Sequence, residues 1–146
     1  MNITELHRKL NNLNNDITSI LTGIDYRYAE VLYDDQVEYN PNNPNDRLLK
    51  DEFEDMLLHL QEISWKLEYL KKDIIGEYIL HLNQNDRYEC SVMEYHCGVT
   101  IEFYYYDDWD DCFKWVVSRV EHKNGSYYIV GYDNVVMDGL KVRIRR

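Results

Sequence analysis

Residues 67–82 read LEYLKKDIIGEYILHL, and the spacing of their apolar side chains changes partway along this stretch. Up to Ile74 the apolar residues recur at steps of three and four, the spacing that places side chains on one face of an α-helix. Beyond Gly76 they alternate with polar residues, as in a half-buried β-strand. The stretch therefore predicts an α+β fold, with a helical domain over residues 1–75 and a small β domain over residues 76–146.

The N-terminal half carries two regular apolar seams. The first falls at Ile3, Leu6, Leu10, Leu13, Ile17, Ile20 and Ile24, and the second at Leu49, Phe53, Met56, Leu60, Ile63, Leu67, Leu70 and Ile74. Strict alternation of three- and four-residue steps is the a/d pattern of coiled coils. Two such helices, joined by a short loop, are expected to fold back as an antiparallel hairpin with the seams as its core. Pairing between chains through the same seams is the competing interpretation, and it would give a homodimer.

Both helices have recognisable starts. Asn2 precedes the first helix and Glu5 follows three residues later, which resembles a capping box. The loop over residues 40–46, NPNNPND, contains both prolines of the chain. Within this loop, Asn43 is the expected N-cap of the second helix and Pro44 fits its first turn.

The C-terminal half reads as a series of short strands. The expected strands cover residues 78–82, 87–92, 99–106, 113–121, 127–132 and 140–145. Residues 83–86 and 123–126 have the composition of hairpin turns. Short strands this closely spaced predict a small, strongly curved antiparallel sheet or a barrel of SH3-like size.

Composition narrows the class of protein. Acidic side chains number 27 against 16 lysines and arginines, which gives a formal net charge of −11. This charge opposes general binding to phosphate backbones, so we expect no direct nucleic-acid binding. It favours a basic protein partner instead. No apolar run is long enough to span a bilayer, and we expect no membrane partner.

Residue patterns typical of catalysis and cofactor binding are absent from the sequence. It contains no glycine-rich phosphate loop, no G-x-S-x-G elbow and no H-E-x-x-H pair. The three cysteines lack the paired C-x2-C spacing of zinc sites. We therefore expect no enzyme, no cofactor and no metal site. The N-terminus lacks the basic and apolar regions of a signal peptide, so we expect a cytoplasmic protein with reduced thiols.

An acidic segment is the most unusual local feature. Residues 107–111 read DDWDD, four carboxylates around one tryptophan. One interpretation is a solvated hairpin tip that prevents aggregation at a sheet edge. A second is a docking site, because spaced negative charge and an aromatic anchor suit an arginine-rich surface. A third is a divalent-cation loop, although the EF-hand pattern of residues is missing. The candidate partner-binding residues are Asp107, Asp108, Trp109, Asp110 and Asp111, with Asp34, Asp35 and Glu38 as secondary candidates.

The last expected strand carries the opposite charge. Lys141, Arg143 and Arg145 alternate with Val142 and Ile144. In a strand the three cations share one face while the two apolar residues point to the core. These cations are the candidates for nucleic-acid contact, as an alternative function. We favour a second role for them, in which they neutralise carboxylates of the same chain.

The C-terminal half also resembles a known family. The resemblance rests on the order of motifs at residues 69–72, 75–78, 87–89, 96–98, 101–102, 115–116, 118–121, 127–131 and 137–145. In this order they are similar to a family of small uncharacterised proteins carried on conjugative elements, plasmids and phages of Gram-positive bacteria. The resemblance implies a helical N-terminal segment followed by a small SH3-like β domain, and it supplies no catalytic residues.

An origin on mobile elements implies an anti-defence role, since small acidic proteins from such elements often block nucleases. The charge and the resemblance together predict a non-enzymatic, anti-CRISPR-like inhibitor. It would act as a DNA mimic that occupies a basic nucleic-acid-binding surface of a host nuclease, such as a CRISPR effector. One alternative is an accessory interaction or dimerisation module of a conjugative element. The second alternative is nucleic-acid binding through the basic C-terminal strand.

Overall fold

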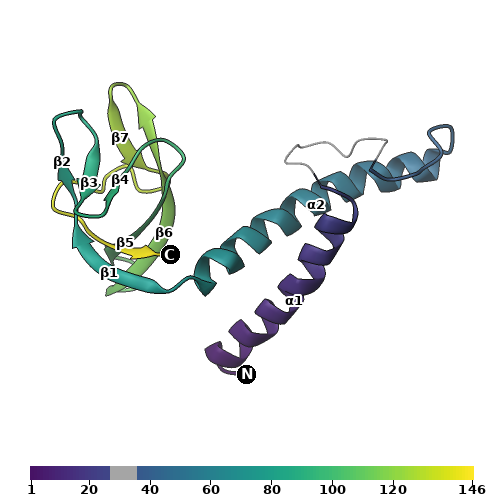
Figure 1. The fold of residues 1–146 in the computed structure, drawn as a ribbon, viewed down its shortest axis with the longest axis horizontal. Coiled ribbons are helices and arrows are strands. Elements are labelled where there is room, and N and C mark those ends of the chain that lie inside the picture. The colour runs from purple at the N-terminus through teal and green to yellow at the C-terminus, as the bar shows by residue number, and fades with distance from the viewer. Residues whose placement is uncertain (27–35) are drawn as a thin grey trace. The chain divides into compact units, whose positions relative to one another are not determined.

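The computed structural model describes residues 1–26 and 36–146. The chain divides into two compact units, Met1–Lys72 and Asp73–Arg146, which we term the helical unit and the β unit. Two helices precede a series of antiparallel strands, so the α+β order expected from the sequence is confirmed (Figure 1). Among the described residues, neither helix combines the length and the apolar character that a membrane span requires.

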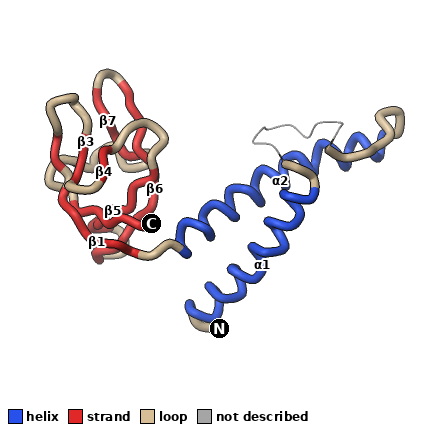
Figure 2. The backbone as a smooth tube through the Cα atoms, viewed as in Figure 1, coloured by secondary structure: helices blue, strands red, loops and turns tan. Residues whose placement is uncertain are grey.

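The helical unit contains two helices, α1 (Ile3–Gly23) and α2 (Pro44–Lys71). Figure 2 shows them running alongside each other. Asn14 of α1 donates a hydrogen bond to Glu68 near the end of α2, at 2.5 Å. Ile20, later in α1, lines a groove together with Phe53, which is earlier in α2. The two helices are therefore antiparallel, as the sequence predicts.

Both predicted N-caps are confirmed. The Asn2 side chain accepts a hydrogen bond from the Glu5 backbone N–H at 2.8 Å, and the Asn43 side chain accepts one from Asn45 at 2.9 Å. These bonds satisfy backbone donors that the first turn of a helix leaves without intrahelical partners.

The contact between the helices is displaced from the predicted seam. The buried residues are Asn14, Ile17, Leu57, Ser64 and Leu67. Ile17 and Leu67 belong to the seam, whereas the other three occupy the neighbouring e position of the heptad. Within the two helices, the seam residues that stay exposed are Ile3, Leu6, Leu10, Leu13, Ile20, Leu49, Phe53, Met56, Ile63 and Leu70. The prediction that the seams form the hairpin's core is thus wrong for most of their length, because the apolar stripe is wider than one partner helix covers.

The β unit begins directly after α2. Lys72 is extended, with φ −65° and ψ 142°, and Asp73 exchanges backbone hydrogen bonds of 3.1 and 3.0 Å with Arg146. This exchange pairs the two ends of the unit and starts a strand. Ile74 therefore begins a strand instead of continuing the helix, contrary to the helical spacing of the sequence.

The strands of the β unit form two antiparallel sheets. Their bounds are β1 (Ile74–Ile79), β2 (His81–Leu82), β3 (Tyr88–Cys90), β4 (Met93–Glu94), β5 (Thr100–Asp107), β6 (Cys112–Lys123), β7 (Ser126–Ile129) and β8 (Lys141–Arg145). The larger sheet has the order β1-β8-β5-β6-β7 and the smaller one the order β2-β3-β4. The predicted antiparallel sheet is confirmed. Within residues 73–146 the outer strands β1 and β7 do not pair, so no closed barrel forms and the SH3-like alternative is not confirmed.

The two hairpin turns predicted from composition are present. Asn124 and Gly125 have φ of +52° and +82°, the left-handed torsions that two-residue hairpin turns require. In the other turn, the Asn83 side chain accepts hydrogen bonds from the backbone N–H groups of Asn85 and Arg87. Asparagine and glycine favour these conformations, which explains why sequence composition located the turns.

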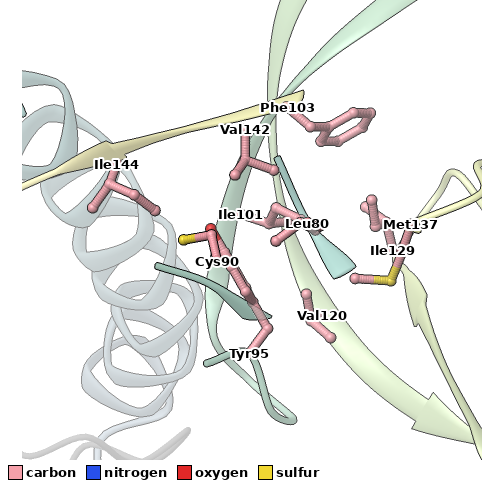
Figure 3. Packing of buried hydrophobic residues seen from close by; sticks show 10 residues of the cluster. All are labelled: Leu80, Cys90, Tyr95, Ile101, Phe103, Val120, Ile129, Met137, Val142 and Ile144. Carbon is pink, nitrogen blue, oxygen red and sulfur yellow. The ribbon is translucent and has the colours of Figure 1, made fainter. Parts of the chain in front are cut away.

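The core of the β unit gathers apolar side chains from both sheets and from the loop before β8 (Figure 3). The buried cluster consists of Leu80, Cys90, Tyr95, Ile101, Phe103, Val120, Ile129, Met137, Val142 and Ile144. On β5, Ile101 and Phe103 belong to this core and alternate with Glu102, whose side chain stands on the opposite face of the sheet. One face of β5 thus packs into the apolar core, and the other face carries the polar side chain of Glu102.

Candidate partner-binding site

The acidic segment forms the turn at the tip of the β5–β6 hairpin. The two strands pair in register up to Asp107 and Cys112, and residues 108–111 connect them. Trp109 lies in this turn and is 94% exposed. The expected position of the segment at a hairpin tip is confirmed.

Asp107 organises the turn. Its Oδ1 accepts hydrogen bonds from the backbone N–H groups of Trp109, at 2.9 Å, and Asp110, at 3.4 Å. Its Oδ2 accepts a hydrogen bond from Nζ of Lys114. The same Nζ lies 3.6 Å from the Asp110 carboxylate. The Lys114 ammonium, and after it the Trp109 N–H, lowers the pKa of Asp107, and Asp107 in return raises the pKa of Lys114. Asp107 therefore holds the turn together.

Asp111 is held at the other end of the turn. The Tyr106 hydroxyl donates a hydrogen bond to its Oδ1, and this bond raises the pKa of Tyr106. The φ of Asp111 is +49°, in the left-handed region that aspartate tolerates better than most residues. The turn is thus fixed at both ends, and its residues 108–111 are all exposed, so a partner can reach them.

Replacing Lys114 with methionine is expected to raise the pKa of Asp107, because the ammonium that stabilises the charged carboxylate is lost. The lowered pKa of Asp107 stabilises the fold above the ordinary aspartate pKa of about 4, and this stabilisation is lost as pH falls through the folded-state pKa. The variant should lack this contribution at neutral pH. An NMR titration of the Asp107 carboxyl group in both proteins measures the change.

The control for this titration is Lys123→Met, which removes an exposed cation at the opposite end of β6. It should leave the Asp107 titration where it is in the unmodified chain. If Lys114→Met behaves like this control, the ion pair does not hold the turn.

The secondary acidic candidates are separate from this turn in the sequence. Asp34 and Asp35 lie outside the described residues. Glu38 is an exposed residue of the helical unit. The site described by the structure therefore consists of residues 107–111 and their two supports, Tyr106 and Lys114.

The cations of β8 are neutralised within the chain. Glu102, only 2% exposed, accepts hydrogen bonds from Nε of Arg143 at 2.6 Å and Nε of Arg145 at 2.7 Å. Nζ of Lys141 lies 2.8 Å from the Glu77 carboxylate on β1. The predicted pairing of these cations with carboxylates of the same chain is confirmed.

Aromatic rings flank these ion pairs. Tyr104 and Trp115 lie opposite each other on β5 and β6, with ring centroids 5.1 Å apart. The Arg143 guanidinium lies 4.5 Å from the Trp115 centroid, and the Lys141 ammonium lies 5.3 Å from that of Tyr104. Phe113, 60% exposed, stacks on Tyr104. This cluster was not predicted from the sequence, although the strict alternation along β5 could have indicated it.

The three cysteines of the chain lie in the β unit. Cys90 is a buried free thiol, and Cys97 and Cys112 are exposed free thiols. Over residues 1–26 and 36–146, no group of three histidine, cysteine, aspartate or glutamate side chains is arranged to hold a metal ion.

Comparison with known proteins gives one match. Neither the curated proteins nor the solved structures contain a chain that matches this one. A family model does match; it begins within β1 and ends within β8, and it covers the acidic turn, Glu102 and Arg143. The expected resemblance to an uncharacterised family is confirmed to this extent. Residues 77–144 of the β unit match the family model of DUF5348, a domain of unknown function.

Proposed function

We propose that this protein acts by protein–protein contact, with the acidic turn of residues 107–111 as its contact site and a basic protein surface as its target. The observation that carries the proposal is the exposure of Trp109, 94%, on a turn whose backbone Asp107 fixes. An aromatic anchor flanked by the carboxylates of Asp108 and Asp110 is a combination that protein interfaces use.

The charge of the chain supports a basic target. A net charge of −11 attracts a positively charged surface over long range and speeds association at low salt. The same charge repels nucleic acid. The cations of β8, which are the alternative nucleic-acid candidates, are engaged by Glu77 and Glu102. We therefore favour a protein partner over direct nucleic-acid binding.

In its specific form, the proposal is a non-enzymatic, anti-CRISPR-like inhibitor. The turn would occupy the basic nucleic-acid-binding surface of a host nuclease, such as a CRISPR effector, in the bacterial cytoplasm. The resemblance to proteins of mobile elements supports this form, and so does the cluster of carboxylates, which can meet arginines as phosphates do. The alternative is an accessory module of a conjugative element, in which the same turn binds a protein without inhibiting it.

The test compares three forms of the full chain immobilised on beads. They are the unmodified chain, a tip variant with Asp108→Lys, Trp109→Ala and Asp110→Lys, and a control with Asp133→Lys and Asp138→Lys. Both variants change the net charge equally at exposed acidic positions, but only the first alters the acidic turn. Each form is incubated with a nuclease-treated lysate of a Gram-positive bacterium, and captured proteins are identified by mass spectrometry.

We expect the unmodified chain and the control to capture a basic protein at least about tenfold better than the tip variant does. Capture should weaken as salt is raised. Equal capture by the tip variant would exclude the turn as the contact site. Competition with DNA or guide RNA separates the two forms of the proposal. If DNA or guide RNA displaces a captured nuclease from the beads, the inhibitor is supported. If the captured protein is a conjugation or replication protein that stays bound in the presence of DNA or guide RNA, the accessory module is supported.

A further inference from the structure

We propose that the helical unit binds a second copy of the chain through an exposed apolar face, forming a four-helix bundle. This inference is independent of the proposed function of the acidic turn. The face, which we term the d face, consists of the d positions of the two seams, Leu6, Leu13, Ile20, Leu49, Met56, Ile63 and Leu70. Each of these side chains is between 41% and 52% exposed.

Antiparallel packing brings both halves of the d face to the same side of the hairpin. In each helix the buried residues occupy positions e and a of the heptad, namely Asn14 and Ile17 in α1 and Leu57, Ser64 and Leu67 in α2. Position d precedes e by one residue and so lies about 100° away around the helix axis. Because the helices run in opposite directions, this equal rotation carries the d positions of both to one side. Ile20 of α1 and Met56 of α2 accordingly line the same apolar groove.

The exposed area of the d face matches what a stable dimer needs. Ile3, Leu10 and Phe53 border the face and are 79%, 37% and 45% exposed. Together with the d positions they offer on the order of 800 Å² of apolar surface, about one partner's share of a standard protein interface. Monomeric proteins seldom expose a contiguous apolar patch larger than roughly 600 Å². The hairpin therefore has the surface of half a helical bundle.

The pattern of the face favours a copy of itself as the occupant. A strict a/d repeat is typical of helices that pack against other helices, and a two-fold axis brings two identical d faces together. The charged positions beside the face have mixed signs, with Lys9 and Asp16 on α1 and Glu52 and Lys66 on α2. A mixed rim lets two copies approach despite the net charge of −11. A membrane surface would instead favour a rim rich in lysine and arginine.

The test measures the mass of the full chain in solution by analytical ultracentrifugation over a wide range of concentration. The unmodified chain should sediment at twice the single-chain mass of 17.7 kDa. The variant with Leu13→Glu and Met56→Glu places charges in the interior of the bundle and should sediment as a single chain, with dimerisation weakened at least about a hundredfold. Both side chains are half-exposed in the hairpin, so its helical circular dichroism should persist.

The matched control carries Asn12→Glu and Asn15→Glu, which add the same two charges at exposed polar positions of α1. It should remain a dimer. A single-chain mass for the unmodified chain at every concentration would overturn the proposal. In that case, binding of the chain to phosphatidylserine vesicles would show that the d face contacts a membrane surface instead of a second copy. Dimerisation that survives in the glutamate variant would overturn it too. If that variant loses helicity, the milder pair Leu6→Gln and Ile63→Gln replaces it and is judged by the same outcomes.

Discussion

Truncation of Phe103 to alanine is expected to unfold the β unit. Phe103 is fully buried, and its ring makes edge-on contacts with Tyr105 and Tyr132 at centroid distances of 6.0 and 5.2 Å. Removing a buried phenylalanine side chain costs about 3–5 kcal/mol. A core of about 70 residues rarely supplies more than roughly 3–5 kcal/mol in total. The substitution therefore removes nearly all of the free energy of unfolding of this unit.

Amide hydrogen exchange of the full chain measures this effect strand by strand. The matched control is Phe113→Ala on the neighbouring strand β6, where the same atoms are removed from a side chain that is 60% exposed. The control should lose less than about 1 kcal/mol. Slow exchange that persists in β5 and β8 of the Phe103→Ala protein would contradict the central place of this ring in the core.

Substitution of Glu102 by glutamine is expected to lower the free energy of unfolding of the β unit by about 3 kcal/mol. The carboxylate is buried, and the side chains of Arg143 and Arg145 that contact it are only 19% and 11% exposed. Glutamine keeps the shape of the side chain but removes the charge that compensates two guanidinium groups. Removal of one partner from a buried ion pair costs about 3–5 kcal/mol, and the partial exposure of the arginines places this case at the lower end.

Urea unfolding, followed through NMR signals of the β unit, measures the loss. Glu77→Gln is the control, since it removes the carboxylate of the more exposed pair with Lys141. Pairs of that kind contribute less than about 1 kcal/mol. An equal decrease in the free energy of unfolding in the two variants would mean that burial does not make the Glu102 ion pairs more stabilising than the exposed pair.

Local periodicity predicted both helices and most of the strands, because each of these buries one face. The expected strand over residues 78–82 is instead divided between β1 and β2, and β4 was not predicted. The alternation over residues 99–106 located β5 to within one residue at each end, at Thr100–Asp107. The caps at Asn2 and Asn43 were also predictable, since each involves a hydrogen bond to a backbone group two or three residues away. Interactions of such short range are visible in a sequence.

The arrangement of the elements depends on pairing between distant residues. Glu102 meets Arg143 across 41 positions of the chain, and β1 pairs with β8 at the opposite end of the unit. No local spacing encodes these partners, so the order of the sheet and its open edges were not predictable. In the helices, the a/d pattern identified the apolar stripe but not which part of it the partner helix covers.

In the candidate site, too, the local features were predictable from the sequence and the contacts with neighbouring strands were not. Turn chemistry and charge located residues 107–111 at a hairpin tip. The different roles within the segment depend on Lys114 and Tyr106, which lie on the strands beside the turn. Their hydrogen bonds engage Asp107 and Asp111, which the sequence alone could not distinguish from Asp108 and Asp110 between them.

The turn at the β5–β6 tip is ordered before any partner arrives. A tryptophan on a loose loop loses conformational entropy when it is captured, at a cost of roughly 1–2 kcal/mol for each backbone residue that becomes fixed. In this turn the backbones of Trp109 and Asp110 are hydrogen-bonded to Asp107 in the free chain, so that entropy is lost on folding and not on binding. The stiffness that Lys114 gives to the turn thereby becomes a determinant of affinity, separate from the residues that touch the partner.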